Sequence, residues 1–488
     1  MVVCLIIPPS AFLLDERVFP SLGILRVAAC LEQAGVDVEV LDLSGVENYL
    51  DVLVSHVTHT EADMFGITAT TPQMPAASRI STTLLEYRKC VRRILGGPHV
   101  TLVHAAMKSE EKREICGRGH KAYWHIFRVF DAAVFGDGDR AVFDVLGEPY
   151  KVAANGDDPD SELFLTNAGY DAVPWPARHL IDLKSYHYTI DGEPATSAIF
   201  QLGCPMACTF CGGRESPSLR RIRMRSIDNI IGEMRMLHEV YGYKALMAYD
   251  DELNINPQMG PLMWAISELS EELGFRWKLR GFIKAELFTE EQAVAMRMAG
   301  FEWILVGFES GSPRILDNIN KKATREDNTR CLHIARKYGL KVKALMSLGH
   351  AGECCESFHD TREWLLENKP DDFDVTCITT YPGTPYFDHA VETGPGIWTY
   401  TAPRTKDRLH AFETDFHAEA AYYKGTPGEY KSFVFTDKLS CEQLVKMRDD
   451  LETEVREKLG IPFNAANPGV RFEASMGQLP GNVLRKSR

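Results

Sequence analysis

Two patterns of apolar and polar positions, one typical of strands and one typical of helices, alternate along the first third of the chain. Short apolar runs, typical of buried strands, recur at residues 2–9, 36–43, 63–71, 91–99 and 131–139. The segments between them carry apolar residues at helical spacing, and the segment from Leu22 to Gly35 ends at a glycine typical of a helix C-cap. This alternation predicts an α/β fold with a parallel, doubly wound, Rossmann-like sheet. Ligands of such sheets bind in the loops beyond the carboxyl ends of the strands.

The same alternation resumes after residue 192. Six further strands are predicted at 197–203, 244–250, 275–281, 301–309, 340–348 and 373–380. Helices separate them at 227–241, 257–273, 289–299, 323–338 and 355–368. Six strand–helix units are fewer than the eight that close a full barrel, so the sequence predicts an open, partial (β/α)6 barrel.

The remaining segments lack this regularity. Turn-forming residues dominate between the two alternating regions, and the tail holds one amphipathic helix at 439–458 before an irregular final stretch of 25 residues. We therefore predict a Rossmann-like domain at 1–146, a linker at 147–192, a partial barrel at 193–390 and a small mixed C-terminal region at 391–488.

Charge and hydropathy narrow the class of protein. The 488 residues carry a formal net charge of −14 at pH 7, which favours a small-molecule substrate over nucleic acid. No apolar run reaches the roughly 18 residues of a membrane span. The opening "MVVCLIIPP" lacks the basic start and the cleavage site of a signal peptide, so we expect a first strand and a cytoplasmic protein.

Three of the 12 cysteines lie close together in "QLGCPMACTFCGGRES". Cys204, Cys208 and Cys211 have the spacing C-x3-C-x2-C directly after an apolar strand. Thiolates bind soft metals and iron–sulfur clusters, whereas a structural zinc site normally takes four ligands. The loop therefore predicts a [4Fe–4S] cluster with one iron open to a small molecule. Zinc and three structural thiols are the alternatives.

This loop resembles the signature of the radical SAM superfamily, including an aromatic residue, Phe210, before the last cysteine. The resemblance implies that the open iron binds the amino and carboxylate groups of S-adenosylmethionine (SAM). The cluster then cleaves SAM to methionine and a 5′-deoxyadenosyl radical. The fold of that family is the partial (β/α)6 barrel predicted above.

Further residues at predicted strand ends resemble the SAM-contacting segments of the family. "YDDE" follows the second strand, Arg280 ends the third, and "VGFESGS" ends the fourth. The family segment Gly-x-Pro-Gly-Glu after the fifth strand is replaced by "GHAGE". Charged residues and turns are also ordinary at strand ends. The SAM-binding residues that the resemblance implies are Phe210, Gly212, Asp250, Asp251, Glu252, Arg280, Glu309 and Gly349.

The first domain resembles the cobalamin-binding domain that precedes many radical SAM barrels. Its Gly/Pro-rich loops carry the resemblance, and "PWPARHLIDL" resembles the joining segment. The motif Asp-x-His-x-x-Gly, whose histidine ligates cobalt, is absent. Such loops also suit phosphate or nucleotide. The cobalamin-binding residues that the resemblance implies are Pro8, Pro9, Gly66, Thr68, Thr70, Gly96, Gly97, His99, Gly136 and Gly138.

Other chemistry-bearing residues have two interpretations each. The vicinal Cys354 and Cys355 could ligate a second cluster, but such a pair is more often structural. His99 could touch the corrinoid edge or anchor its loop. The alternating arginines after the cluster loop could neutralise a carboxylate or form a solvated strand face; these are Arg221, Arg223 and Arg225.

Together the resemblances imply a cobalamin-dependent radical SAM enzyme that receives electrons from an external flavodoxin- or ferredoxin-like donor. The expected reaction methylates an unactivated carbon or phosphorus centre through methylcobalamin and the 5′-deoxyadenosyl radical. A cyclisation or rearrangement with the same cofactors is the alternative. A tRNA methylthiotransferase-type enzyme would carry further amino-terminal cluster cysteines and a basic carboxy-terminal module, and a corrinoid sensor would leave the three cysteines unexplained.

Overall fold

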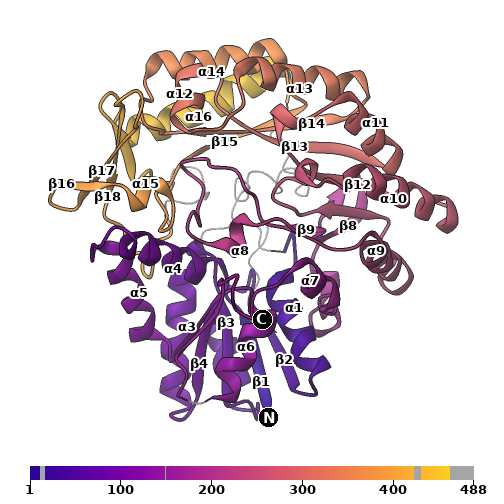
Figure 1. Cartoon of the computed structure of the whole chain (residues 1–488), viewed down its shortest axis with the longest axis vertical. Helices are drawn as coiled ribbons and strands as arrows, with labels where there is room; N and C mark the ends of the chain where they lie inside the picture. Colours follow the sequence, from indigo (N-terminus) through magenta and orange to yellow (C-terminus); the bar gives the residue numbers. More distant parts are fainter. Residues whose placement is uncertain (11–16, 149, 422–429, 462–488) are drawn as a thin grey trace.

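The computed structural model describes residues 1–10, 17–148, 150–421 and 430–461, so the irregular tail predicted above lies outside the described residues. The first parallel sheet has the strand order β2-β1-β3-β4-β5-β6. Its strands are β1 (Val2–Ile7), β2 (Asp37–Asp42), β3 (Met64–Thr68), β4 (Arg92–Gly96), β5 (Ala132–Gly136) and β6 (Ala153–Gly156). Helices cover both faces (Figure 1): α1 (Leu22–Gln33), α2 (Tyr49–Val57), α3 (Met74–Tyr87), α4 (Pro98–Glu111), α5 (Arg118–Val129) and α6 (Gly138–Gly147). The strand order reverses between β1 and β3, which is where such sheets form a ligand crevice.

The sixth strand, β6, is a difference from the prediction. It lies in the segment expected to be a linker and extends the first sheet to residue 156. Its four residues, "AANG", are too short and too weakly apolar to give a strand signal. Gly156 packs tightly: a Cβ there would lie 2.2 Å from the Asp137 carbonyl oxygen.

The second sheet confirms the partial barrel. Six parallel strands follow one another in the order of the sequence, with β7 (Thr189–Ile190) antiparallel at the edge. They are β8 (Glu193–Ala198), β11 (Ala245–Ala248), β12 (Lys278–Ile283), β13 (Phe301–Glu309), β14 (Lys341–Leu348) and β15 (Asp372–Cys377). The outer layer consists of α9 (Ile227–Tyr241), α10 (Met259–Leu273), α11 (Glu290–Ala299), α13 (Arg325–Lys337) and α14 (Cys355–Asn368) (Figure 1). Trp277 is fully buried in the core between the sheet and these helices.

The C-terminal region packs against the last strand of the barrel. The antiparallel sheet of β16 (Val391–Gly394), β17 (Ile397–Thr401), β18 (Arg408–Phe412) and β19 (Val434–Thr436) precedes α16 (Cys441–Leu459), which confirms the predicted helix. Ser440 caps α16 by accepting from the Gln443 amide. The Glu452 and Arg456 side chains of α16 bind β15 at the Val375 amide (2.7 Å) and at Asp372 (2.9 Å). The helix therefore covers the last barrel strand.

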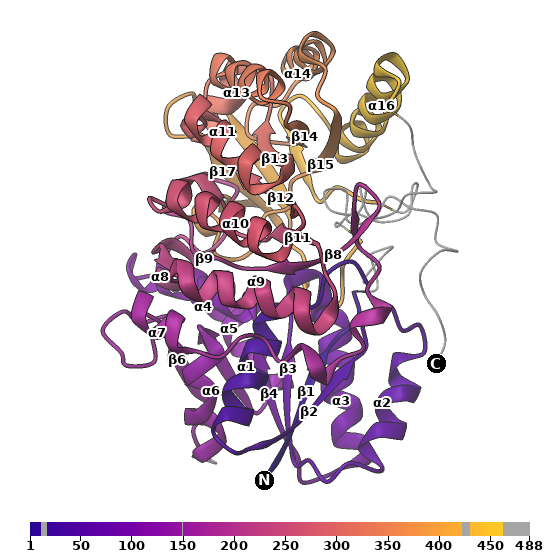
Figure 2. The same ribbon diagram turned by 90° about the vertical axis from the view of Figure 1, so that its right-hand side faces the viewer.

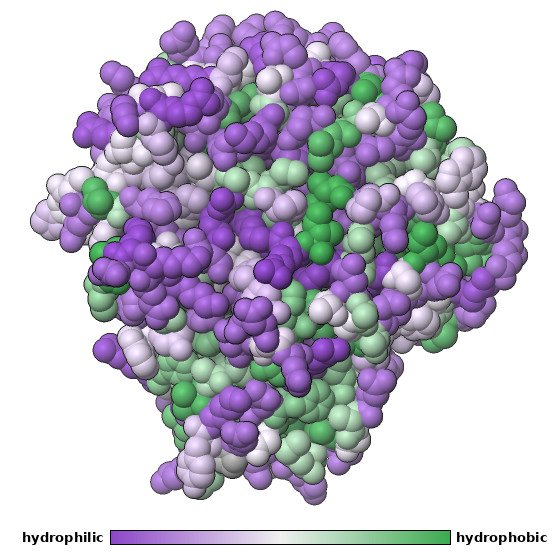
Figure 3. All heavy atoms as spheres, viewed as in Figure 1, coloured by the Kyte–Doolittle hydropathy of each residue, from purple (hydrophilic) through white to green (hydrophobic). Residues whose placement is uncertain are grey.

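The barrel stands on the carboxyl edge of the first sheet (Figure 2). Arg118 of α5 lies between the rings of Phe387 and Trp398, with its guanidinium carbon 3.6 and 4.3 Å from the ring centres. On the face seen in Figure 1, a patch of hydrophilic side chains lies near the middle of the molecule, beside a strip of hydrophobic ones (Figure 3). Among the described residues, no helix has the length and apolarity needed to cross a membrane.

Candidate active site at the domain seam

The three cysteines lie on one loop between the short strands β9 (Gln201–Leu202) and β10 (Arg223–Met224). Cys208 is buried, Cys204 is half-buried and Cys211 is exposed. The Sγ atoms do not all lie within 4.8 Å of one another, whereas tetrahedral zinc at a Zn–S distance of about 2.3 Å needs sulfur atoms about 3.8 Å apart. Three sulfur atoms that lie farther apart than in a zinc site, on one partly exposed loop, suit a cluster of several irons. Burial raises the pKa of Cys204 to about 11, so metal must displace its proton.

Arg220 organises the cysteine loop from α8 (Pro217–Arg220). Its guanidinium donates to the carbonyl oxygens of Cys204 (3.2 Å), Met206 (3.1 Å), Gly212 and Gly213 (3.2 Å). It also donates to the Cys211 sulfur at 3.5 Å. One planar cation therefore holds both ends of the loop and adds positive charge beside one cluster ligand. The sequence interpretation missed this residue, because neighbouring arginines carried the alternating pattern.

We expect Arg220→Ala to lose iron to a mild chelator at least several-fold faster than the wild type, since the loop loses five hydrogen bonds. Removal of the charge should also lower the reduction potential of the cluster by on the order of tens of millivolts. Arg220→Lys is the matched control, because it keeps the positive charge but lacks the planar guanidinium with its several donors. It should restore the potential and leave iron loss fast; equal potentials in all three proteins would contradict the electrostatic role.

Carboxylates crowd the strand ends beside the loop. Asp250, which follows β11, accepts the amides of Phe200 (2.7 Å) and Gln201 (3.0 Å), so it fixes the backbone that leads into the cysteines. Burial raises the pKa of Asp250 to about 7 and that of Glu252 to about 7. Asp251 is exposed, yet the surrounding protein desolvates its carboxylate enough to raise its pKa as well. Within the described part of the chain, Glu252 Oε2 is buried without a hydrogen-bond partner, which is expensive unless a ligand donates to it.

Two buried lysines face these carboxylates, and the sequence interpretation missed both. Lys321 Nζ lies 3.2 Å from Glu309 Oε1, and its pKa is raised by nearby anions, Glu309 first, which outweigh its burial. Lys284 Nζ pairs with Glu286 (2.6 Å) and donates to the Lys321 carbonyl (3.1 Å). The barrel mouth therefore holds both signs of charge. Glu309 itself has φ +65° at a bulge of β13, a strained backbone typical of functional sites.

A hydrogen-bonded chain continues from Glu309 across the mouth. Ser347 donates to Glu309 Oε2 at 2.7 Å, and the Ser347 hydroxyl lies 2.8 Å from His350 Nε2. His350 Nδ1 lies 3.2 Å from the Tyr386 hydroxyl. Burial lowers the pKa of His350 to about 4, so the ring is neutral at pH 7. Phe210 packs against its edge with ring centres 5.4 Å apart, which links the cysteine loop to this chain.

Arg280 is a correction to the expected position. It does not end a strand: β12 runs to Ile283, so Arg280 lies in the first half of the strand, paired with Met247 and Trp303. Its guanidinium carbon lies 5.1 Å from the ring centre of Trp303 inside the barrel, and burial lowers its pKa to about 9. Lys284 takes the place at the mouth where Arg280 was expected.

Two of the glycines predicted to contact SAM make close contacts within the protein. A Cβ at Gly212 would lie 2.5 Å from the Leu102 side chain of α4, so the end of the cysteine loop touches the first domain. Gly349 has φ +89°, and its amide donates to Glu353 at 3.3 Å. In the vicinal pair considered for a second cluster, Cys354 is the N-cap of α14 and Cys355 is exposed.

The loops predicted for cobalamin converge at the carboxyl edge of the first sheet. Pro8 and Pro9 follow β1, and the Pro8 carbonyl accepts from Gln73 at 2.8 Å. Gln73 in turn caps the turn at Thr70, next to Thr68 at the end of β3. Gly66 differs, because it lies inside β3 against Leu5. The Gly96–Gly97 turn packs on the β3 loop, with the Ala69 amide 3.1 Å from the Gly96 carbonyl oxygen.

His99 anchors its own loop. Its amide donates to the Ala69 carbonyl at 3.0 Å, and Nδ1 lies 3.1 Å from the Thr71 hydroxyl. Burial lowers the pKa of His99 to about 3, so the ring stays neutral.

Gly97 offers a test of this crevice. It has φ +97°, and a Cβ there would lie 2.6 Å from Thr68 Oγ1 and 2.9 Å from the Ala69 amide nitrogen. We expect Gly97→Ala to destabilise the protein by about 1–3 kcal/mol and to reduce bound corrinoid several-fold. Gly147→Ala, where nothing lies within 4 Å, should keep the corrinoid content of the wild type. Both variants should retain their iron, and wild-type corrinoid content in Gly97→Ala would contradict the crevice assignment.

Two arginines after the loop neutralise buried carboxylates. Arg223 pairs with Asp137, between Gly136 and Gly138 at the end of β5, and Arg225 pairs with Glu233. Arg221 is exposed. Asp157, which follows β6, adds a second link, since its Oδ1 accepts from the Ser216 hydroxyl (2.6 Å) and the Ser218 amide (2.9 Å). The cysteine loop is thus bound to the first sheet by two aspartates.

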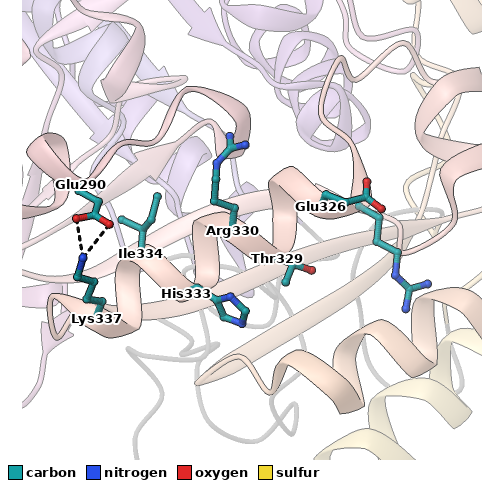
Figure 4. Close-up of a pocket in the computed structure, with 8 residues that line it drawn as sticks. Glu290, Glu326, Thr329, Arg330, His333, Ile334 and Lys337 are labelled. Atoms are coloured by element: carbon teal, nitrogen blue, oxygen red, sulfur yellow. Dashed lines mark hydrogen bonds and ion pairs between the residues drawn. The ribbon is translucent and has the colours of Figure 1, made fainter.

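A separate surface cavity of about 480 Å³ lies on the outer helix layer (Figure 4). Its lining comes mainly from α13, and Lys337 pairs with Glu290 of α11 at 2.7 Å across it. These helices cover the outside of the barrel, so the cavity does not belong to the site at the strand ends.

Comparison with protein families identifies the family to which this site belongs. A model of the radical SAM superfamily matches residues 198–365, and a B12 binding domain model matches residues 16–127. The chain belongs to the B12-binding radical SAM enzymes. The cofactors of this radical SAM enzyme are a [4Fe–4S] cluster, SAM and cobalamin.

Relatives of this radical SAM enzyme span more than one reaction. An uncharacterized methyltransferase of Pyrococcus horikoshii is 26% identical over 400 residues, which cover 80% of this chain and 83% of the relative. An anaerobic magnesium-protoporphyrin IX monomethyl ester cyclase of Rubrivivax gelatinosus is 23% identical over 75% of this chain and 64% of its own. The structure of the methyltransferase TsrM from Kitasatospora setae has a TM-score of 0.63 at 17% identity, over 98% of this chain and 93% of TsrM.

Proposed function

We propose that this enzyme is a cobalamin-dependent methyltransferase that methylates an unactivated carbon or phosphorus centre of a small metabolite. The observation that carries the proposal is the direct bonding of the cysteine loop to the carboxyl edge of the B12-binding sheet, through Asp137 and Asp157. A methyl donor held by one domain and a radical generated in the other must reach the same substrate atom, which requires adjacent sites.

The cofactors supply the difficult steps, since SAM and cobalamin together provide radical hydrogen abstraction and a transferable methyl group. The chain's own residues bind and orient. We infer that the Glu252 carboxylate and the buried Lys284 and Lys321 ammonium groups suit the amino and carboxylate groups of SAM. The neutral His350, held between Ser347 and Tyr386, adds a fixed polar group beside Phe210.

Cyclisation without methyl transfer is the second candidate, and a specific observation favours it. Two relatives are magnesium-protoporphyrin cyclases, at 23% and 22% identity over 75% and 70% of this chain. Methyltransferases are also found among the relatives, including a hopanoid C-3 methylase at 25% identity over 43% of this chain. The P. horikoshii methyltransferase covers the largest share of the chain among these.

Product mass separates the two reactions. The reconstituted enzyme, with measured iron and corrinoid, is incubated without oxygen with SAM, a strong reductant and a metabolite extract. Methylation adds about 14 mass units to a metabolite, and SAM with a trideuterated methyl group makes that about 17. Cyclisation instead removes about two hydrogens, with no label in the product. An enzyme that binds four irons but no corrinoid would overturn both candidates.

We also propose a cytoplasmic enzyme that receives electrons from an external flavodoxin- or ferredoxin-like donor. All 12 cysteines are free thiols, which is typical of a reducing compartment. The exposed Cys211 brings the cysteine loop to the surface, where a one-electron donor can approach.

A further inference from the structure

The first sheet carries a second group of metal-ligating side chains, remote from the cysteine loop in sequence and in place. We propose that Cys4, Glu39 and His56 bind a zinc-type divalent ion. Cys4 and Glu39 are register partners on the adjacent strands β1 and β2. The last turn of α2 brings His56 over both of them. In the described part of the chain, this is the one trio of His, Cys, Asp or Glu whose ligand atoms all lie within 4.8 Å of one another.

The distances suit a single tetrahedral ion. His56 Nε2 lies 3.5 Å from Cys4 Sγ and 3.0 Å from Glu39 Oε2. With Zn–S about 2.3 Å and Zn–N and Zn–O about 2.0–2.2 Å, tetrahedral angles require separations of about 3.6 Å between sulfur and nitrogen and about 3.4 Å between nitrogen and oxygen. These two separations differ from the tetrahedral values by a few tenths of an ångström, and the Cys4 sulfur and the Glu39 carboxylate oxygen lie within 4.8 Å of each other. The same imidazole nitrogen faces both partners, as convergence on one ion requires.

The chemistry of the three groups favours an ion over a plain hydrogen-bonded trio. Cys4 is fully buried, and its sulfur lies beside the Glu39 carboxylate on the neighbouring strand and 3.5 Å from His56 Nε2. A buried thiol opposite a carboxylate gains little by itself, whereas a divalent cation stabilises the thiolate and the carboxylate at once. The thiol proton leaves to solvent when the metal binds.

The surroundings support such a site. The Thr60 hydroxyl donates to Glu39 Oε2 at 2.6 Å and so fixes the carboxylate. The side chains of His56 and Glu39 are 27% and 35% exposed. The fourth position therefore faces solvent and suits a water molecule. The ion would join β1, β2 and α2 at the edge of the sheet, away from the strand carboxyl ends where the cofactors bind.

Zinc content tests the proposal in the full-length enzyme with its cluster. The protein is supplied with zinc, dialysed against a weak chelator, and analysed for zinc and iron. We expect about one zinc per chain in the wild type and at least a tenfold loss in Cys4→Ala, His56→Gln and Glu39→Gln, with iron unchanged. Cys30→Ala is the matched control, because Cys30 is also a buried thiol of this domain and lies on α1. It should keep its zinc.

Glu39→Gln guards against misfolding, because the half-exposed side chain keeps its shape and loses only its charge. X-ray absorption at the zinc edge should find one sulfur with nitrogen and oxygen neighbours in the wild type. A wild type without zinc, or zinc that persists in all three variants, would overturn the site and leave a hydrogen-bonded trio. Zinc that disappears in Cys208→Ala instead would assign it to the cysteine loop, which also overturns the proposal.

Discussion

Cys208→Ala is expected to purify with background iron, where the wild type reconstituted without oxygen holds about four irons per chain. Cys208 is 8% exposed, whereas Cys211 is exposed. A cluster held by both would therefore have one buried and one solvent-facing ligand. Two remaining thiolates hold a four-iron cluster weakly, since each lost ligand leaves an iron to solvent. The same loss is expected for Cys204→Ala and Cys211→Ala.

Cys355→Ala provides the control for these variants. Cys355 is an exposed thiol at the start of α14 and should keep all of its iron. Secondary structure measured by circular dichroism should be the same in all variants, because the cysteine loop and its flanks contribute only two-residue strands and one four-residue helix. An iron content equal to that of the wild type in all three loop variants would contradict a cluster at this loop. Loss of iron in Cys355→Ala would indicate a second cluster.

The sequence could predict the two sheets because each has a clear periodicity. The helices at 227–241 and 355–368 match α9 and α14 at both ends, since apolar spacing and a cap define each of them. The cysteine loop was also predictable, because its spacing is local.

The charged mouth of the barrel was harder to predict. The third strand was predicted to end two residues early, and along a strand residues 280, 282 and 284 share one face. Arg280 and Lys284 therefore point to the same side but lie in different layers of the barrel. An error of two residues in the predicted strand end therefore placed Arg280 at the barrel mouth, where the structure has Lys284.

The contacts between the domains could not be predicted from local pattern. The ion pair between Arg223 and Asp137 joins residues 86 positions apart, and Asp157 meets Ser216 across 59. Such pairs depend on how two separately folded units pack together. The alternating arginines are equally compatible with neutralising a buried carboxylate and with forming a solvated strand face. Only the packing of the two domains distinguishes these alternatives.

Glu233→Ala is expected to lower the free energy of unfolding by about 3–5 kcal/mol, because it leaves two buried guanidinium groups without their anion. Glu233 Oε1 accepts from Arg178 at 2.6 Å and Oε2 from Arg225 at 2.5 Å. Arg178 belongs to the segment between the domains and also donates to the Ser197 carbonyl of β8 at 2.8 Å. The loss should therefore loosen the seam as well as α9.

Chemical denaturation at pH 7 measures the effect, with Glu272→Ala as control. Glu272 binds Arg235 through two oxygens at 2.6 Å on the exposed surface, so its removal should change stability little. The two arginines lower the pKa of Glu233 below its ordinary 4.5 and outweigh its burial. Its contribution is present above that value and is lost as pH falls through the lowered folded pKa, so the gap between wild type and Glu233→Ala should narrow in acid. An equal effect of both variants at pH 7 would show that the buried triad does not hold the seam.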